Sequence, residues 1–366
     1  MIIERFLSCG DTTKGFLLFK CKNGCGVHYQ GLTCKSKFCP KCGKKYRDQR
    51  TNQVSAKLLN VPHRQFVFTI PKEFRLYFQK YRFLLNSLYK SVNDSFNYLL
   101  GNHKGIAKKE KRRLGFISFL HTYGRDMKWN PHLHILVAER FINKDNELKN
   151  FSYFHFNKLR KAYMFFLTAN VYNSLKQNNV PKDISKDVRS INKTLTEYYK
   201  DGFYVHGPKL KTISLRSMKI LTKYITRYAS HPPISERRIS KVDYINHTVS
   251  WFYDPHEDDH LPEDENKKGR QFITEHVFDF MKRLLIHIND NNFKTIRYFG
   301  FYSNRSKLDN HSFLFEQSKL KQMHLNTFWI RGIYTTFGFN PLICDVCKNR
   351  MTLNLNESYL PRGNSP

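Results

Sequence analysis

Three histidines fall within one short stretch of the chain, residues 119–139, which reads FLHTYGRDMKWNPHLHILVAE. His132 and His134 are separated by a single leucine, and His121 lies shortly before them. Imidazole nitrogens bind divalent metal ions, and three such ligands leave coordination positions open for a substrate, as a catalytic metal requires. The grouping favours a metal site over three unrelated histidines, but imidazole alone does not distinguish Zn, Mn, Fe and Ni.

Two predicted strands must position these histidines. Residues 114–121 (LGFISFLH) and 132–138 (HLHILVA) are rich in hydrophobic, β-forming residues and flank a short turn. Side chains alternate across a strand, so His132 and His134 project from the same face. If the strands pair as an antiparallel hairpin, His121 can lie opposite one of these two histidines on that face. The hairpin would then bring three metal ligands to one patch.

A pair of tyrosines adds a second kind of chemistry. Tyr224 and Tyr228 are four residues apart in a predicted helix, residues 214–230, which Pro232 and the following proline end. Both lie on the flank of the apolar stripe of this helix, which is also typical of tyrosines that pack a ring and expose a hydroxyl. A tyrosine hydroxyl can attack a phosphodiester when a metal ion polarises the phosphate. Together with the histidines, the pair favours phosphoryl transfer.

Six of the eight cysteines lie in the first part of the chain, where thiolates at short spacings are typical of zinc modules. Disulfides are the alternative, but they are rare in the reducing compartment that we expect for this chain. His28 is a further possible ligand, and the sequence is compatible with one zinc site or with two. The candidate zinc ligands are Cys9, Cys21, Cys25, Cys34, Cys39 and Cys42.

The last two cysteines, Cys344 and Cys347, form an isolated CxxC motif near the end of the chain. Two thiolates cannot fill a tetrahedral metal site. The motif is therefore either a half-site that other residues complete or a pair of free thiols.

The charge of the chain indicates a polyanionic partner. The 366 residues include 62 Lys and Arg against 30 Asp and Glu, a net charge of +32. Such an excess favours nucleic acid, because neutralising phosphates releases counterions. No apolar run is long enough for a membrane span and the start has no signal-peptide pattern, so we expect a cytoplasmic protein without a membrane partner. A GxxxxGK[ST] phosphate loop is absent, so we expect no nucleotide cofactor.

Periodicity elsewhere predicts an α+β fold with antiparallel sheets and packed helices. The predicted strands are 64–70, 248–254 and 293–302, and the predicted helices are 44–60, 72–100, 153–178 and 277–288. We expect three parts along the chain. These are residues 1–60 as a zinc-binding module with a linker helix, 61–245 as the catalytic core, and 246–366 as a DNA-contacting region of strands and helices with the CxxC motif.

The motifs resemble those of a known family. His132-Leu133-His134 resembles the HUH motif (His, hydrophobe, His), and Tyr224 with Tyr228 resembles the two-tyrosine signature of rolling-circle HUH endonucleases. The segments LTCKSKFCPKCG, RQFVFTIP and YITRYASHPPISERRI also resemble rolling-circle transposases of bacterial insertion sequences that carry an amino-terminal zinc domain. The resemblance spans nearly the whole chain and implies an HUH endonuclease core built on an antiparallel sheet.

The resemblance also implies a mechanism and its partners. One tyrosine would cut single-stranded DNA at the ends of the element and remain on the 5′ phosphate, and the second would permit a further strand transfer. The family implies Mg²⁺ or Mn²⁺ at the histidine site and a bacterial, nucleoid-associated location. A replication initiator or relaxase with the same site is the closest alternative. A non-catalytic zinc-dependent DNA-binding protein and a zinc hydrolase are alternatives of other classes.

Overall fold

The computed structural model describes residues 2–36, 39–102, 110–207, 232–255, 269–290, 292–303 and 329–361. The chain divides into two compact units, each of which is described by itself. The described parts of the first unit are 2–36, 39–59 and 329–361, with Pro232; those of the second are 60–102, 110–207, 233–255, 269–290 and 292–303. The segment 246–366, predicted as one region, therefore has described residues in both units.

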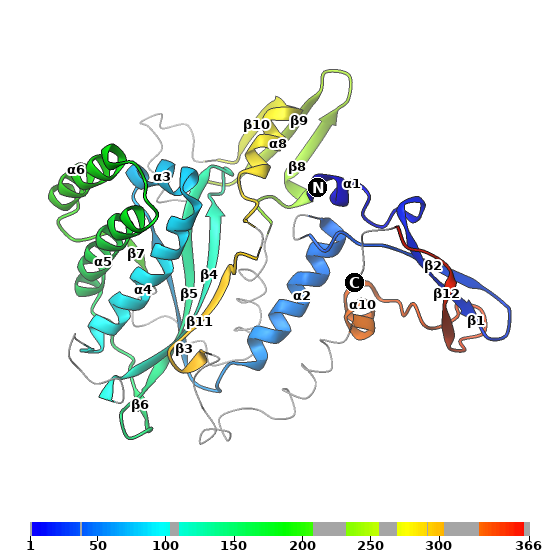
Figure 1. Cartoon of the computed structure of the whole chain (residues 1–366), viewed down its shortest axis with the longest axis horizontal. Helices are drawn as coiled ribbons and strands as arrows, with labels where there is room; N and C mark the ends of the chain where they lie inside the picture. The colour runs from blue at the N-terminus through cyan, green and yellow to red at the C-terminus, as the bar shows by residue number, and fades with distance from the viewer. Residues whose placement is uncertain are drawn as a thin grey trace. The chain divides into compact units, whose positions relative to one another are not determined.

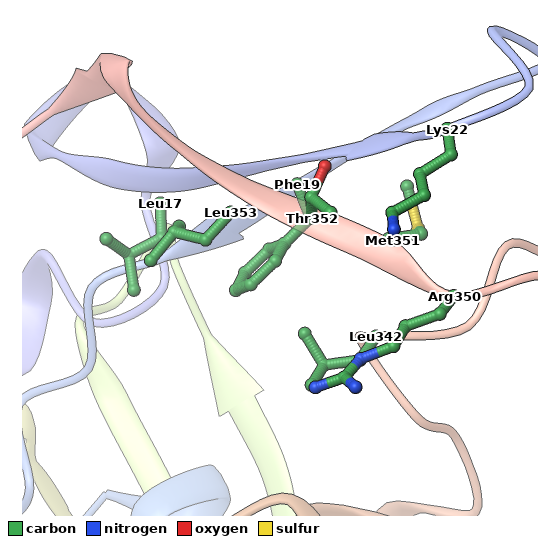
Figure 2. A pocket seen from close by; sticks show the side chains of 8 residues that line it. All are labelled: Leu17, Phe19, Lys22, Leu342, Arg350, Met351, Thr352 and Leu353. Atoms are coloured by element: carbon green, nitrogen blue, oxygen red, sulfur yellow. The ribbon is translucent and has the colours of Figure 1, made fainter.

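The first unit contains a three-stranded antiparallel sheet in the order β12-β1-β2. The central strand pairs with the second strand of its own hairpin and with the last strand of the chain. A hollow of about 480 Å³ opens on this sheet between β1 and β12 (Figure 2). The elements of this unit are α1 (Ile2–Leu7), η1 (Thr12–Lys14), β1 (Phe16–Cys21), β2 (Val27–Gly31), α2 (Pro40–Ala56), α10 (Trp329–Phe337) and β12 (Met351–Tyr359).

The second unit is built on a six-stranded antiparallel sheet with the strand order β11-β4-β5-β3-β7, in which β6 pairs with the outer part of β5. Long strands form here because β-branched and aromatic residues alternate between two buried faces. The strands are β3 (His63–Thr69), β4 (Arg113–Tyr123), β5 (Trp129–Ile142), β6 (Leu148–Asn150), β7 (Val205–His206) and β11 (Ile296–Phe299). The predicted hairpin of β4 and β5 and the predicted strand at 64–70 are confirmed.

Helices cover one face of this sheet (Figure 1). Leu133 and Ile135 of β5 are fully buried in a core that also contains residues of α4, α5 and α6. Burial of this apolar face fixes the pleat of β5 and so decides which residues its other face presents. The helices of this layer are η2 (Lys72–Phe74), α3 (Arg75–Lys80), η3 (Arg82–Leu84), α4 (Leu85–Leu99), α5 (Phe156–Gln177) and α6 (Lys182–Tyr198).

A second, smaller antiparallel sheet in the order β10-β9-β8 belongs to the same unit. Trp251 of this sheet and Phe280 of α8 are buried together with Met127, which lies in the turn between β4 and β5. This contact anchors the turn. The elements of this part are η5 (Glu236–Arg238), β8 (Ile239–Asp243), β9 (Thr248–Tyr253), β10 (Gln271–His276) and α8 (Val277–Leu285), whereas η6 (Gly300–Tyr302) follows β11 and packs against β4 of the larger sheet.

The α+β class with antiparallel sheets is confirmed, and two element boundaries need correction. The helix predicted over 72–100 is broken at Tyr81, whose φ of −113° and ψ of 79° end α3 before α4 begins. The strand predicted over 293–302 is limited to Ile296–Phe299, because the chain turns into a 3₁₀ helix at Gly300 with φ 56°. None of the described helices is both long and apolar enough to cross a bilayer.

Candidate active site and metal centres

The β4–β5 hairpin brings the three histidines together. His121 lies directly opposite His132 in the register of the two strands, and His134 follows on the same face of β5. The ring centroids are 5.5 Å apart for His121 and His132 and 4.8 Å apart for His121 and His134. One nitrogen from each ring lies within 4.8 Å of the other two. The three imidazoles therefore converge from two adjacent strands.

The spacing of the ring nitrogens fits a shared metal ion. The Nε2 atoms of His132 and His134 are 3.1 Å apart. Two imidazole nitrogens bound to one ion at about 2.1 Å, with an angle between 90° and 109°, are about 3.0–3.4 Å apart. The donor set and its spacing therefore fit a divalent cation.

A backbone contact sets the tautomer of His132. Its Nδ1 lies 2.7 Å from the carbonyl oxygen of Asn130. Because a carbonyl only accepts, Nδ1 carries the proton and donates it, which leaves the lone pair of Nε2 directed toward the cluster. Metal-binding histidines in proteins are usually held in this way through their second nitrogen.

Burial favours the neutral rings of His132 and His134, and metal binding requires neutral imidazole. His121 is buried, and His132 and His134 are half-buried. Burial lowers the pKa of His132 from its ordinary value of 6.5. Burial, followed by the neighbouring His121 and His132, lowers the pKa of His134 well below that value. Protons therefore do not compete strongly for these nitrogens near neutral pH.

His287 stabilises the β4–β5 turn, although it is not one of the three clustered histidines. Its Nε2 donates to the carbonyl of Met127, at 2.9 Å, and its Nδ1 accepts from the hydroxyl of Thr122, at 3.1 Å. Its ring stacks on Trp129 with the planes 9° apart. No sequence pattern indicates this role, because His287 lies far from the hairpin along the chain. It fixes both ends of the turn that joins the two histidine-bearing strands.

The stability of the second unit is expected to fall as the pH drops from 7 to 5. Burial lowers the pKa of His287 to about 4, whereas the unfolded chain titrates near 6.5. Between these two pH values His287 binds a proton in the unfolded state but not in the folded state, so the free energy of unfolding decreases as the pH falls from about 6.5 to 4. At pH 5 the loss from this residue is about 2 kcal/mol.

Denaturant unfolding followed by tryptophan fluorescence measures this loss. A His287→Gln variant, whose amide can both donate to Met127 and accept from Thr122, should lose less stability between pH 7 and 5 than the wild type. His247→Asn, at an exposed position of the same unit, is the control and should keep the wild-type pH dependence. Equal pH dependence in all three proteins would contradict this role of His287.

Tyr224 and Tyr228 lie outside the described residues, within 208–231. The predicted helix 214–230 lies there as well. Their role as nucleophiles therefore rests on the sequence pattern.

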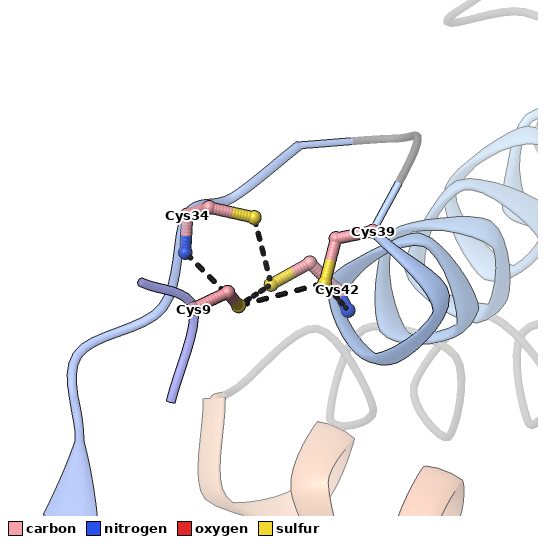
Figure 3. A group of neighbouring side chains, drawn as sticks. All are labelled: Cys9, Cys34, Cys39 and Cys42. Carbon is pink, nitrogen blue, oxygen red and sulfur yellow. Dashed lines mark hydrogen bonds between the residues drawn. The ribbon is translucent and has the colours of Figure 1, made fainter. Parts of the chain in front are cut away.

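The first cysteine cluster consists of Cys9, Cys34, Cys39 and Cys42 (Figure 3). The Sγ atom of Cys9 lies 3.5 Å from those of Cys39 and Cys42, and the sulfurs of Cys34 and Cys42 are 3.8 Å apart. Four sulfurs bound tetrahedrally to zinc at about 2.3 Å are about 3.8 Å from one another. The cluster therefore fits one zinc ion.

Local backbone features place these four thiols. Cys39 caps the amino terminus of α2 and accepts a hydrogen bond from the amide of Cys42, so that both sulfurs leave the first turn of the helix together. Cys9 is brought beside Cys34 because Gly10 donates to the carbonyl of Leu32 at 2.8 Å. A Cβ atom at Gly31 would lie 2.4 Å from the carbonyl of Gly10, so this close approach requires glycine.

Cys21 and Cys25 do not lie in this cluster. They form a second group with Cys344 and Cys347, the isolated CxxC motif. His28 belongs to neither group and instead has its ring near Phe19 and Phe339. Among the described residues, the eight cysteines thus form two groups of four, and none is in a disulfide.

Comparison with known families identifies the chain. Residues 115–309, more than half of the chain, match the Y2 transposase family, described as "Putative transposase". The chain belongs to this family. Residues 1–70 match the "Transposase zinc-binding domain" of IS91-type proteins. The resemblance to insertion-sequence transposases with an amino-terminal zinc domain is therefore confirmed.

Two relatives of the transposase support the assignment. The transposase for insertion sequence element IS801 of Pseudomonas savastanoi pv. phaseolicola is 30% identical over 312 residues, which cover 83% of this chain and 70% of the relative. A protein of Sinorhizobium fredii (strain NBRC 101917 / NGR234) named "Putative transposase y4qJ" is 21% identical over 287 residues, which cover 75% and 66% of the two chains. No solved structure matches the chain.

Removing zinc from the transposase is expected to unfold the first unit and to leave the second folded. Metal binding supplies much of the folding energy in small cysteine modules, whereas the second unit has a large apolar core of its own. Hydrogen exchange measured by mass spectrometry after chelation should show loss of protection in residues 9–42 and retention in β3, β4 and β5. Zinc-free protein purified without chelator, or unchanged protection in 9–42, would contradict this expectation.

Proposed function

We propose that this transposase cuts and joins single-stranded DNA by tyrosine transesterification at the histidine cluster. The observation that carries the proposal is the convergence of His121, His132 and His134 on one face of the β4–β5 hairpin. Three imidazole ligands leave open coordination positions, which suits a site that acts on a phosphodiester.

The histidines would hold Mg²⁺ or Mn²⁺, which when bound polarises the phosphate and stabilises the charge that develops on it. The protein contributes the alignment of its ligands. Asn130 holds the ring of His132, Leu133 fixes the strand in the core, and His287 fixes the turn. These contacts hold the three nitrogens in place before DNA binds, which lowers the reorganisation needed during the reaction.

Tyr224 and Tyr228 would supply the nucleophile. In the proposed step the phenolic oxygen forms a bond to phosphorus and the bond from phosphorus to the 3′ oxygen breaks. The phenol loses its proton, and the leaving oxygen gains one to become a 3′ hydroxyl. The DNA remains on the enzyme as a 5′ phosphotyrosine, so the energy of the broken bond is conserved and no nucleotide cofactor is needed.

DNA would be bound mainly through charge. The net charge of +32 favours binding to the phosphate backbone, and the affinity is then expected to fall steeply with salt. The second turn of α2 carries Lys44 and Lys45, directly after Cys42 of the first zinc cluster, so the first unit is a natural part of this contact. We propose single-stranded DNA as the substrate because the DNA must reach the histidine face without its complementary strand.

Incubating the full chain with labelled single strands from the ends of its own element tests the proposal. With Mg²⁺ or Mn²⁺ present, a protein–DNA complex that resists denaturation is expected. A non-catalytic DNA-binding protein would leave no such complex, and a zinc hydrolase would cut without one. Adding a second, target strand distinguishes a transposase, which joins the two DNAs, from a replication initiator or relaxase that acts only at its own origin.

A further inference from the structure

A second cluster of cysteines joins two segments that are far apart in the sequence. It consists of Cys21 and Cys25, at the turn between β1 and β2, and of Cys344 and Cys347, shortly before β12. The Sγ atom of Cys21 lies 3.3 Å from that of Cys25 and 3.4 Å from that of Cys347. The sulfurs of Cys25 and Cys344 are 3.5 Å apart. These distances are close to the roughly 3.8 Å expected between sulfurs that share one tetrahedral zinc ion.

The amino-terminal half of this cluster is a tight turn between β1 and β2. The amide of Cys21 donates to the carbonyl of Gly26 at 3.0 Å, and the amide of Gly24 donates to the carbonyl of Cys21 at 3.1 Å. Gly24 has φ 72°, a conformation that favours glycine, and this lets the chain reverse within three residues. Cys21 and Cys25 therefore face each other across the turn.

The carboxyl-terminal half has the same design. The amide of Lys348 donates to the carbonyl of Cys344 at 3.0 Å, and the amide of Cys344 donates to the carbonyl of Asn349 at 2.9 Å. Lys348 has φ 57°, so this turn too is closed by a residue in the left-handed region. Paired tight turns that each present two thiols are the usual way in which proteins build a closed structural zinc site.

We propose that these four cysteines bind a second zinc ion, which ties the carboxyl-terminal segment with β12 to the β1–β2 hairpin within the first unit. Four thiolates in tetrahedral arrangement leave no open position, so the site is structural. It places zinc ligands outside residues 1–70, the segment that the zinc-binding domain family covers.

The packing around the cluster explains why a metal is needed there. Besides Cys21 and Cys344, the adjoining core contains only Phe19 and Met351 as buried hydrophobic residues among those described. So few buried side chains cannot offset the entropy of ordering β12 on β1, and small cores of this kind are usually completed by a metal or by disulfides. The zinc ion would supply the missing stability.

The hollow beside this cluster depends on the same contact. Phe19 and Lys22 line it from β1 and the following turn, and Leu342, Arg350 and Leu353 line it from the carboxyl-terminal segment (Figure 2). Both walls are present only while β12 lies on β1. Loss of the second zinc ion should therefore remove this hollow together with the β1–β12 pairing.

Metal content tests the proposal directly. Full-length protein purified without chelator should contain two zinc ions per chain by elemental analysis. The Cys344→Ser, Cys347→Ser double variant should contain one, and the Cys39→Ser, Cys42→Ser double variant, which removes two ligands from the other cluster, is the matched control and should also contain one. One zinc ion in the wild type, two in the Cys344→Ser, Cys347→Ser variant, or iron in place of zinc would overturn the proposal.

Three further measurements distinguish the outcomes if the serine variant is poorly folded. A Cys347→His variant retains a zinc ligand and should keep two ions per chain. Replacing zinc by Co²⁺ in the wild type should give the visible absorption of tetrahedral cobalt–thiolate sites with a stoichiometry of two. Hydrogen exchange of β12 should rise in the serine variant and stay low in the histidine variant; equal protection in both would contradict the role of the metal in holding this strand.

Discussion

Replacing His132 with alanine is expected to reduce cleavage of single-stranded element ends by at least about a thousand-fold. The variant removes one nitrogen of the cluster and also ends the contact with Asn130 that orients it. Because a metal ion contributes several kcal/mol to stabilising charge on a phosphate, loss of the site removes most of the catalysis. The same change at His134 should have a similar effect.

DNA binding by these variants should stay within about two-fold of the wild type, because it rests on the basic surface. Nicking of a labelled strand with Mn²⁺ and binding measured in chelator separate the two effects. His247→Asn, at an exposed position away from the cluster, is the control and should nick normally. Full nicking by the His132→Ala, His134→Ala double variant in chelator would exclude the histidine site as the metal centre.

The Tyr224→Phe, Tyr228→Phe double variant is expected to form no covalent adduct with DNA. Phenylalanine keeps the ring and removes only the hydroxyl, so activity should be lost without loss of folding or of DNA binding. Adduct formation is measured by the denaturation-resistant complex, and folding by the unchanged thermal unfolding of the protein. An adduct formed by the double variant would place the nucleophile elsewhere in the chain.

The two single phenylalanine variants should differ from the double variant. Spacing of i and i+4 on the predicted helix brings both hydroxyls to one side, so either could serve one phosphate in turn. Each single variant should therefore still nick DNA. Complete transposition, which needs a second strand transfer while the first intermediate persists, should require both tyrosines.

The sequence was sufficient to predict the geometry around the histidines. A strand has a period of two, so His132 and His134 had to share a face, and burial of Leu133 on the opposite face fixed which face that is. The predicted pairing left open which of the two histidines faces His121, and the hairpin register places it opposite His132. Local pattern suffices here because the two strands are neighbours in the chain.

The partners of the cysteines could not be predicted in the same way. The short spacings of the first six cysteines indicated a zinc module, but nothing in the spacing of Cys344 and Cys347 indicates that Cys21 and Cys25 complete their site. Long-range contacts of this kind depend on how β12 pairs with β1. The strand β12 was not predicted, although Met351, Leu353 and Leu355 alternate with polar residues; most of its residues are exposed, and its partner strand β1 lies at the other end of the chain.

Two further features of the structure were not predicted. Helix α6 (Lys182–Tyr198) was not predicted, although Ile184, Val188, Ile191 and Leu195 recur at helical spacing in an otherwise mostly polar segment. The hydrogen bonds of His287 with Thr122 and Met127 could not be predicted either, since they join a residue after α8 to the turn of a hairpin that is distant in the sequence.

Mapping the covalent bond between protein and DNA tests the central claim most directly. Trypsin cuts after Lys223 and Arg227, so Tyr224 falls in the peptide YITR and Tyr228 in the peptide that begins YASHPP. Wild-type protein treated with a single-stranded element end and Mn²⁺, then digested with trypsin and nuclease, should yield one or both peptides with a nucleotide attached through phosphate to tyrosine. An adduct found only on other peptides, or strand cleavage with no adduct on any peptide, would contradict tyrosine transesterification by this protein.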